Sequence, residues 1–266
     1  MAERGISVTT LANDAGRRSP ADGIRKAVPA WRMHACGDRC LVVAFDEADV
    51  ALSNTAACEL ARLLLDAQLP GVSDIVPSMA AVGVHYDPAA LAPSSDGTGP
   101  WDALARQVQA LISGIQMAGN SSVREIVLPV CYGGDYGEDL EDVARTCGLT
   151  PDEVIGIHSG TPVSVLMLGF APGHPYIGMF DQRLAIRRRP TPRTAVPRGS
   201  IGLANRQSVI YPTVLPGGWS LIGRTPLTLF SPWRDEPCLL NAGDRIRFKP
   251  ITASEFAALE QQESEQ

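Results

Sequence analysis

The alternation of apolar and polar residues in the first half of the chain predicts a β-hairpin followed by a helix. Two short apolar runs, 31–36 and 40–45, are separated by Gly37 and Asp38, a pair typical of a turn. From 49 to 67 apolar residues recur every three or four positions, as they do along one face of an amphipathic helix. A proline and a glycine follow this stretch, so we expect the helix to end there.

A similar succession of elements then repeats. Residues 75–76 and 80–86 have the alternation of strands, 87–100 is a loop rich in proline, serine and glycine, and 101–117 returns to the helical period. The order is therefore two strands, a helix, two strands and a helix. Such an order predicts a two-layer α+β module.

The second half of the chain begins with helical patterns and then loses them. A strand is predicted at 125–130 and helices at 138–146 and 150–159, the latter opened by the capping-box pattern of Thr150 and Glu153. After a strand at 163–168, short apolar runs alternate with Pro/Gly turns, which is typical of a small β-barrel. These runs are 201–204, 209–211, 221–222, 227–230 and 246–248.

These patterns predict an α+β fold in which a small two-layer domain precedes a β-barrel domain. The first thirty residues mix charged, hydroxylic and glycine residues without an apolar block, so we expect a disordered tail. The chain ends in an acidic helix and a polar tail. The predicted parts are a tail at 1–30, an α+β domain at 31–120, a barrel at 121–252 and the C-terminal helix and tail at 253–266.

Charge is distributed unevenly along the chain. The 266 residues carry a formal net charge of −6, yet the stretch 170–226 holds eight arginines, no lysine and a single acid. That stretch has a net charge of +7, which leaves −13 for the remainder. Because potentials near a surface decay over roughly 8–10 Å at physiological salt, a partner responds to the local charge. The arginine-rich stretch therefore predicts a surface that handles anions.

Several classes of protein are disfavoured by the sequence. No apolar run approaches the about 18 residues of a membrane helix, and no export signal is present, so we expect a cytoplasmic protein with six reduced cysteines. Lys26 and Lys249 are the only lysines, and neither lies in a Walker motif, so this chain has no P-loop nucleotide site. No metal site is expected from the spacing of histidines and cysteines. Nucleic acid is disfavoured because few aromatic residues accompany the arginines.

The candidate chemistry lies on rigid loops of the arginine-rich stretch. This stretch contains eight of the 21 prolines and seven of the 25 glycines, which restrict loops so that they can hold side chains in place. We favour Arg193, Arg198 and Arg224 as residues whose guanidinium groups bind a carboxylate or phosphate through two hydrogen bonds. The run of arginines at 187–189 is interpreted as a solvated basic edge, since three consecutive side chains cannot share one strand face.

Two histidines are candidate functional residues. His174, between Gly173 and Pro175, is expected at an exposed loop tip, where it is either a general acid or base or simply a loop residue. His158 lies at the end of a predicted helix, where its expected role is a C-terminal cap favoured by the helix dipole.

An ordered series of short motifs makes the sequence recognisable. Taken together, the motifs resemble the KipI/PxpB family, which comprises the B subunit of 5-oxoprolinase and allophanate hydrolase subunit 1 and is also called the carboxyltransferase C/D domain. The resemblance covers about residues 31–251 and departs from the family pattern at His174. The motifs are LPVCYGG (128–134), GFAPGHPY (169–176), TPRT (191–194), VPRG (196–199), IYP (210–212), PGGW (216–219) and IGRTP (222–226).

The resemblance implies a small α+β domain followed by a cyclophilin-like barrel. It also implies an enzyme that is active only in a complex with 5-oxoprolinase subunits A and C, of which the C subunit is the direct neighbour. Such a complex opens the lactam of 5-oxo-L-proline to give L-glutamate while ATP becomes ADP and phosphate. Two alternatives stay open: a subunit of an allophanate hydrolase or urea carboxylase, and a non-catalytic inhibitor of a histidine kinase.

The chemistry of lactam opening suits this set of side chains. A resonance-stabilised amide is attacked slowly until its oxygen is activated, and the substrate carboxylate and developing charge need arginines and turn N–H groups. We therefore predict Arg193, Arg198 and His174 as catalytic candidates in a groove shared with the C subunit. The predicted substrate-binding or subunit-facing residues are Tyr176, Gln207, Tyr211, Gly217, Gly218, Trp219 and Arg224.

Overall fold

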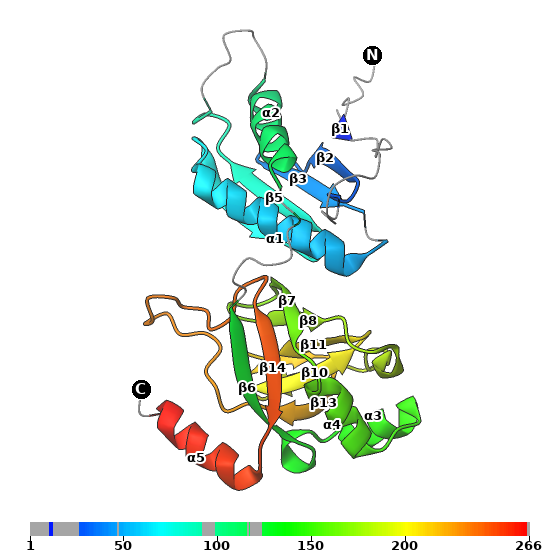
Figure 1. Ribbon diagram of the computed structural model, residues 1–266. Helices are drawn as coiled ribbons and strands as arrows, with labels where there is room; N and C mark the ends of the chain where they lie inside the picture. Colours follow the sequence, from blue (N-terminus) through cyan, green and yellow to red (C-terminus); the bar gives the residue numbers. More distant parts are fainter. Residues whose placement is uncertain are drawn as a thin grey trace, which may run out of the picture. The chain divides into compact units, whose positions relative to one another are not determined.

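The protein divides into two compact units, Met1–Ser121 and Ser122–Gln266, which are described separately. The computed structural model describes residues 11–12, 27–46, 48–91, 99–115, 117 and 124–264 (Figure 1). Most of the predicted N-terminal tail and the end of the C-terminal tail lie outside the described residues. Within the predicted disordered tail, however, Leu11–Ala12 (β1) pairs with the next strand, so the tail prediction is wrong at this point.

In its described residues the first unit has a five-stranded sheet and two helices, α1 and α2. The sheet has the order β1-β2-β3-β5-β4, and all neighbouring strands run antiparallel. The predicted hairpin and the second strand pair are both present. The strands after β1 are Trp31–Ala35 (β2), Cys40–Phe45 (β3), Val72–Pro77 (β4) and Ala81–Tyr86 (β5).

Helix α1 (Val50–Ala67) begins where Asp49 accepts a hydrogen bond from the backbone N–H of Leu52. It packs on β3, β4 and β5 and contacts α2, so apolar residues of both helices join those of the strands in one core. Helix α2 (Pro100–Ser113) ends before the predicted limit at residue 117 because Gly114 stops it. The two-layer architecture thus follows from the helical and alternating patterns of the sequence.

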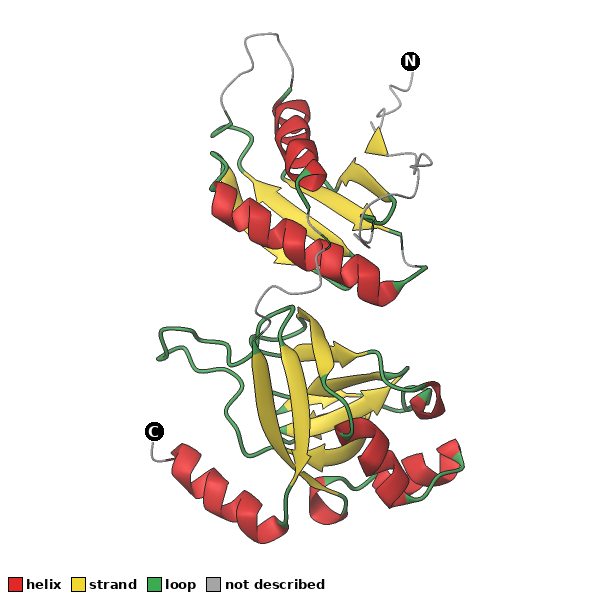
Figure 2. Ribbon diagram, viewed as in Figure 1, coloured by secondary structure: helices red, strands yellow, loops and turns green. Residues whose placement is uncertain are grey.

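The second unit is built on a closed barrel, formed by seven of the described strands in the order β10-β11-β8-β7-β14-β6-β13 (Figure 2). Strand β13 pairs with β10 and closes the ring. Two further strands, β9 and β12, form a separate two-stranded sheet. The bounds are Glu125–Tyr132 (β6), Val163–Leu168 (β7), Pro175–Gly178 (β8), Arg193–Val196 (β9), Ser200–Ala204 (β10), Gln207–Ile210 (β11), Leu215–Gly217 (β12), Ser220–Arg224 (β13) and Arg245–Pro250 (β14).

Strands β6 and β14 form the parallel pair of this barrel. Arg124 and Asp244, which precede the two strands, form an ion pair with 2.6 Å between Nη2 and Oδ2. The predicted strand at 227–230 is wrong, because this segment makes only an isolated bridge between Phe230 and Cys238. Pro226 precedes this segment, and Pro232 with the turn that it begins follows it, so the segment is a loop.

Three α-helices among the described residues accompany the barrel. Helices α3 (Leu140–Cys147) and α4 (Pro151–Ser159) pack on β13 and β14, and α5 (Ala253–Ser264) contacts β6. The capping box predicted at Thr150 and Glu153 is present. The apolar side chains of this unit form two clusters, one inside the barrel and one that includes Tyr211 and Trp219. The second cluster lies where the candidate motifs gather.

Candidate functional site

Four aromatic side chains on neighbouring barrel strands and their loops form the centre of the candidate site. We call His174, Tyr176, Tyr211 and Trp219 the aromatic cluster. The ring centroid of His174 lies 5.2 Å from that of Tyr176 and 5.4 Å from that of Tyr211, while Tyr176 and Trp219 are 6.1 Å apart. Four of the residues predicted from sequence are therefore brought together, although 45 positions separate the first from the last.

The loop before β8 turns His174 inward rather than outward. The backbone N–H of His174 donates to the carbonyl of Ala171, and its carbonyl accepts from Gly169. Gly173 has a φ of +72°, and a Cβ there would lie 2.7 Å from the side chain of Phe230, so only glycine fits. The prediction of an exposed loop tip is wrong, because the loop closes against the 229–230 segment.

Burial keeps the imidazole of His174 neutral. The residue is only 2% exposed, and its Nδ1 has no hydrogen-bond partner among the described residues. Burial lowers the pKa of His174 to about 4, because the charged ring would lose its hydration. At neutral pH the ring therefore acts as an uncharged group that contacts the tyrosines. Its Nδ1 is itself buried and has no contact with solvent.

Tyr211 and Trp219 fix the opposite side of the aromatic cluster. Burial, followed by the nearby Tyr176, raises the pKa of Tyr211 to about 12, so its hydroxyl stays protonated. A Cβ added to Gly217 would lie 2.0 Å from that hydroxyl oxygen, which means that the phenol rests directly on the glycine backbone. The glycine predicted as a site residue is thus required for close approach.

One arginine of the 187–189 run lies on this cluster. The guanidinium carbon of Arg188 is 4.8 Å from the centroid of the Trp219 ring, a cation–π arrangement. The side chain remains exposed, and no ion pair joins it to an acid in the described part of the chain. The predicted solvated basic edge is therefore only partly right, since Arg188 is held over an aromatic face.

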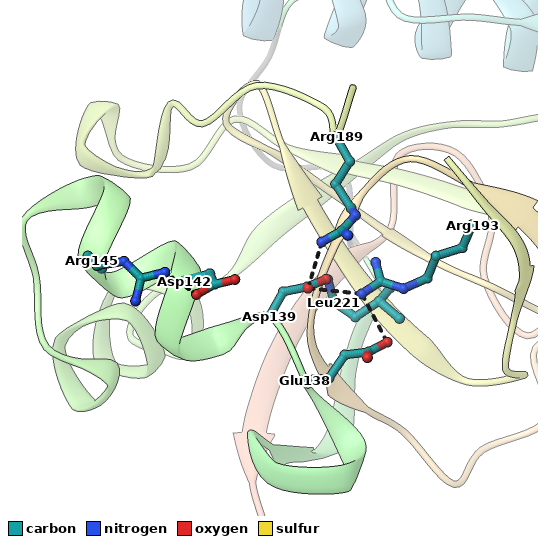
Figure 3. A network of polar contacts seen from close by, with 7 residues as sticks. All are labelled: Glu138, Asp139, Asp142, Arg145, Arg189, Arg193 and Leu221. Carbon is teal, nitrogen blue, oxygen red and sulfur yellow. Dashed lines mark hydrogen bonds and ion pairs between the residues drawn. The ribbon is translucent and has the colours of Figure 1, made fainter. Parts of the chain in front are cut away.

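The neighbouring arginines turn toward a buried carboxylate, as Figure 3 shows. Oδ1 of Asp139 accepts from Arg189 at 2.8 Å and from Arg193 at 2.9 Å, and Oδ2 accepts from the backbone N–H of Leu221 at 2.7 Å. Arg193 also forms an ion pair with a second acid, Glu138, at 3.0 Å. We call these residues the Asp139 network. It ties the loop before α3 to β9, β13 and the 187–189 segment.

Arg193, Arg198 and Arg224 are all engaged within the chain. Arg193 belongs to the Asp139 network, and the hydrogen bond to Asp139 raises its pKa further. Arg198 donates to the hydroxyl of Thr228 at 3.0 Å. Arg224 donates to the carbonyl of Arg198 at 2.7 Å and lies 3.7 Å from Glu260 of α5. The structure therefore places Arg188, rather than these three, beside the aromatic cluster with its charge unmatched.

Comparison with known proteins identifies the family. The family described as carboxyltransferase domain, subdomain C and D, matches residues 31–240. The chain belongs to this family. The prediction of KipI/PxpB membership is thereby confirmed, together with the α+β fold that contains a closed barrel.

Curated relatives cover most of this carboxyltransferase-family chain. The B subunit of 5-oxoprolinase from Bacillus subtilis (strain 168) is 35% identical over 235 residues, which are 87% of this chain and 98% of that protein. The B subunit of 5-oxoprolinase from Escherichia coli O157:H7 is 38% identical over 220 residues, 82% of this chain and 95% of that protein. Both likenesses thus extend through the two units.

Solved structures share the arrangement of the elements. TTHA0988 is 34% identical with a TM-score of 0.69, and the match covers 81% of this chain and 40% of that chain. The urea amidolyase of Kluyveromyces lactis is 19% identical with a TM-score of 0.70, over 90% of this chain and 16% of that chain. The second likeness establishes the fold alone.

The described residues of this carboxyltransferase-family chain offer no cluster for a metal ion. Nowhere among them do three His, Cys, Asp or Glu side chains gather in a way that could hold one. In the part of the chain that the structure describes, no helix combines the length and apolar character needed to cross a bilayer.

Another predicted site residue, Gln207, lies buried on β11, where its backbone pairs with Gly178.

The second histidine of interest, His158, lies inside the barrel. Its Nδ1 is 2.7 Å from the hydroxyl of Tyr132, and its Nε2 is 3.0 Å from the hydroxyl of Ser208, which itself donates to the carbonyl of Gly202. This network assigns the proton to Nε2 and lets Nδ1 accept from Tyr132. The predicted role as a helix cap is wrong, because the side chain reaches into the core instead.

The two buried histidines make stability fall at mildly acidic pH. Burial lowers the pKa of His158 to about 3 and that of His174 to about 4, whereas both titrate near 6.5 when unfolded. Below pH 6.5 the unfolded chain binds protons that the folded chain does not, so we expect a loss of roughly 1–2 kcal/mol per histidine between pH 7 and pH 5.

Urea unfolding at pH 7, 6 and 5 measures this loss, and a His174→Phe variant is expected to show a shallower slope because one of the two histidines is absent. Asp181, whose pKa is lowered to about 2 by hydrogen bonds from Arg183, changes only at more acidic pH and does not interfere. A stability that stays constant from pH 7 to pH 5 contradicts the prediction.

Proposed function

We propose that this chain is the B subunit of an ATP-dependent 5-oxoprolinase and that it acts with subunits A and C. The complex hydrolyses 5-oxo-L-proline to L-glutamate while ATP is converted to ADP and phosphate. The observation that carries this proposal is the match to the B subunit of 5-oxoprolinase from Bacillus subtilis, which extends over 98% of that protein. A cytoplasmic complex in which the C subunit contacts the barrel is part of the proposal.

The aromatic cluster and Arg188 fit the chemical demands of the substrate. A five-membered lactam has two flat faces, one of which can pack on the partly exposed ring of Tyr176. Its carboxylate needs a cation, and Arg188 offers a guanidinium held over Trp219 with no acid beside it in the described chain. His174 contributes an uncharged, buried ring that contacts Tyr176 and Tyr211 and holds them in place.

The other predicted arginines take different roles in this proposal. Arg193 and Arg189 hold the Asp139 network, so they position the segment that carries Arg188. The backbone N–H of Arg189 also donates to the carbonyl of Gly218 at 2.7 Å, which fixes this segment to the PGGW motif. Arg198 and Arg224 hold the loop before β10 near α5. We assign them as positioning residues that act through Arg188 and the aromatic rings.

ATP enters the proposal as a substrate of the complex. Activation of a lactam oxygen by phosphorylation turns a slow amide hydrolysis into two easier steps. This chain has no Walker motif. We therefore expect the phosphorylation step to require at least one of the other subunits, and the isolated chain to be inactive.

Reconstitution tests the assignment directly. This chain is co-expressed with candidate A and C subunits, and the purified complex is supplied with ATP and 5-oxoproline, allophanate or urea in separate assays. The expected result is release of glutamate and phosphate in equal amounts from 5-oxoproline, and none when this chain is omitted.

If the complex acts on allophanate or urea and not on 5-oxoproline, the chain is instead a subunit of an allophanate hydrolase or urea carboxylase. Inhibition of the autophosphorylation of a histidine kinase, with no contribution to 5-oxoproline hydrolysis, refutes the enzyme assignment altogether. Each outcome uses the same purified chain, so that differences in folding do not enter the comparison.

Arg188→Gln is expected to lower the turnover of the assembled complex by about tenfold, or ~1.4 kcal/mol, because the substrate carboxylate loses its cation. The substitution removes one charge from an exposed side chain and leaves the Asp139 network intact. Arg247→Gln is the matched control, since Arg247 is an exposed arginine of β14 paired with Glu125. Equal turnover in the two variants, with assembly confirmed by gel filtration, argues against a role for Arg188.

A further inference from the structure

A concave region lies beside the Asp139 network. It is a cavity of about 500 Å³ between α3 and the 182–189 segment. Val143 and Ile186, which are 2% and 7% exposed, give it an apolar floor. Hydroxyl, amide and guanidinium groups complete its wall. These are the side chains of Thr146, Gln182, Arg183, Arg187, Arg189 and Ser220.

The carboxylates that line this cavity are already neutralised. Asp139 is shared between Arg189 and Arg193 and also accepts from the N–H of Leu221. Asp142 forms an ion pair with Arg145, one turn further along α3 (Figure 3). Neither acid is therefore free to repel an anion or to attract a metal ion.

The cations of the cavity are less completely matched. Arg183 pairs with Asp181, but the guanidinium of Arg187 has no hydrogen bond or ion pair with any described residue. The Nε of Arg189 is buried and also lacks an acceptor within the described chain. The Arg189 side chain as a whole is 38% exposed and lines the cavity, so the exposed part of its guanidinium can reach a ligand there.

We propose that this cavity is a binding site for a small organic anion. An oxyanion headgroup, either carboxylate or phosphate, bonds to the guanidinium of Arg187 and to the exposed part of the guanidinium of Arg189. The body of the molecule covers Val143 and Ile186. A bare inorganic ion leaves this floor and most of the volume unfilled, and 500 Å³ falls in the usual range for small-molecule sites.

This site is distinct from the aromatic cluster, and its existence does not depend on the proposed function. Arg187 and Arg188 are consecutive, yet one lines the cavity and the other lies over Trp219. The two sites are linked through Arg189, which shares Asp139 with Arg193 and whose backbone bonds to Gly218. An anion bound to Arg189 therefore acts on the same segment, 187–189, that positions Arg188.

Arg187 and Arg188 provide a matched pair of variants for the test. The full-length chain is titrated separately with L-glutamate, 5-oxo-L-proline, ADP and inorganic phosphate by isothermal calorimetry, and bound probes are located by amide chemical shifts. We expect at least one organic anion to shift the amides of Val143 and Thr146. Its affinity falls at least fivefold in Arg187→Gln and changes less than twofold in Arg188→Gln.

The outcome also separates the sources of the anion. Binding of glutamate or 5-oxoproline indicates a carboxylate site, and binding of ADP indicates a phosphate site. The proposal is overturned if none of the four probes binds at millimolar concentration, or if inorganic phosphate alone binds. It is likewise overturned if affinity depends on Arg188 and not on Arg187, since the probe then occupies the aromatic cluster. Because no reaction is measured, a failure here leaves the proposed enzyme function untouched.

Discussion

Replacement of Asp139 by alanine is expected to lower the free energy of unfolding of the barrel unit by about 3 kcal/mol. The carboxylate is 7% exposed and accepts hydrogen bonds from two guanidinium groups and the backbone N–H of Leu221. When the carboxylate is removed, a buried backbone N–H loses its acceptor and two neighbouring guanidinium groups lose their counter-charge. Arg193 keeps Glu138 and Arg189 is partly exposed, so the expected cost lies at the lower end for a broken buried pair.

Urea unfolding of the purified chain measures this effect. Asp142→Ala is the matched control, because Asp142 lies on the helix that follows but is 62% exposed and pairs with an exposed arginine. A surface pair contributes at most about 1 kcal/mol, so the control is expected to remain near the wild type. Similar losses in the two variants would show that the network adds nothing beyond an ordinary surface contact.

Replacement of Gly217 by alanine is expected to disrupt the aromatic cluster and to reduce turnover of the complex by more than tenfold. The new Cβ would lie 2.0 Å from the hydroxyl oxygen of Tyr211 and 2.7 Å from its Cζ. Tyr211 is 1% exposed and cannot swing away, so either its ring or strand β12 has to move. Overpacking of this kind costs about 1–3 kcal/mol of stability.

Gly218→Ala is a sharp control for this effect, because the adjacent glycine has room for a methyl group. A Cβ at Gly218 meets its nearest atom, the carbonyl oxygen of Arg189, at 3.6 Å, an ordinary contact. A Tyr211→Phe change in the Gly217→Ala background removes the closest clash and is expected to restore part of the stability. Wild-type stability in Gly217→Ala, or equal damage at both glycines, contradicts the packing argument.

The sequence predicts most of the helices and strands, because the patterns that indicate them are local. Periodic apolar positions located α1, and the Thr150 capping box located α4, since both signals come from residues within a few turns. The barrel was predicted from the ordered series of motifs, because its short strands are hard to recognise one by one. The strand expected at 227–230 failed because an apolar run of four residues does not specify a pairing partner.

The candidate site was predicted only in part, because it depends on contacts between distant segments. Between a glycine and a proline His174 is expected to be exposed, but in the fold its ring contacts Phe170, Tyr176 and Tyr211. Asp139 was missed as well, since its partners lie 50 to 82 positions further on. The only local signal was a pair of acids, Glu138 and Asp139, and such pairs are usually solvated.

The parallel pairing of β6 with β14 has a consequence for synthesis of the chain on the ribosome. Arg124, at the start of β6, meets Asp244 at a separation of 120 positions. At roughly 5–20 residues per second, this first barrel strand waits about 6–24 s for its last partner to be made. During that interval the backbone N–H and C=O groups that later pair with β14 have no strand partner. Nascent chains stalled before β14 should therefore recruit chaperones, whereas all of the N-terminal unit has been synthesised long before.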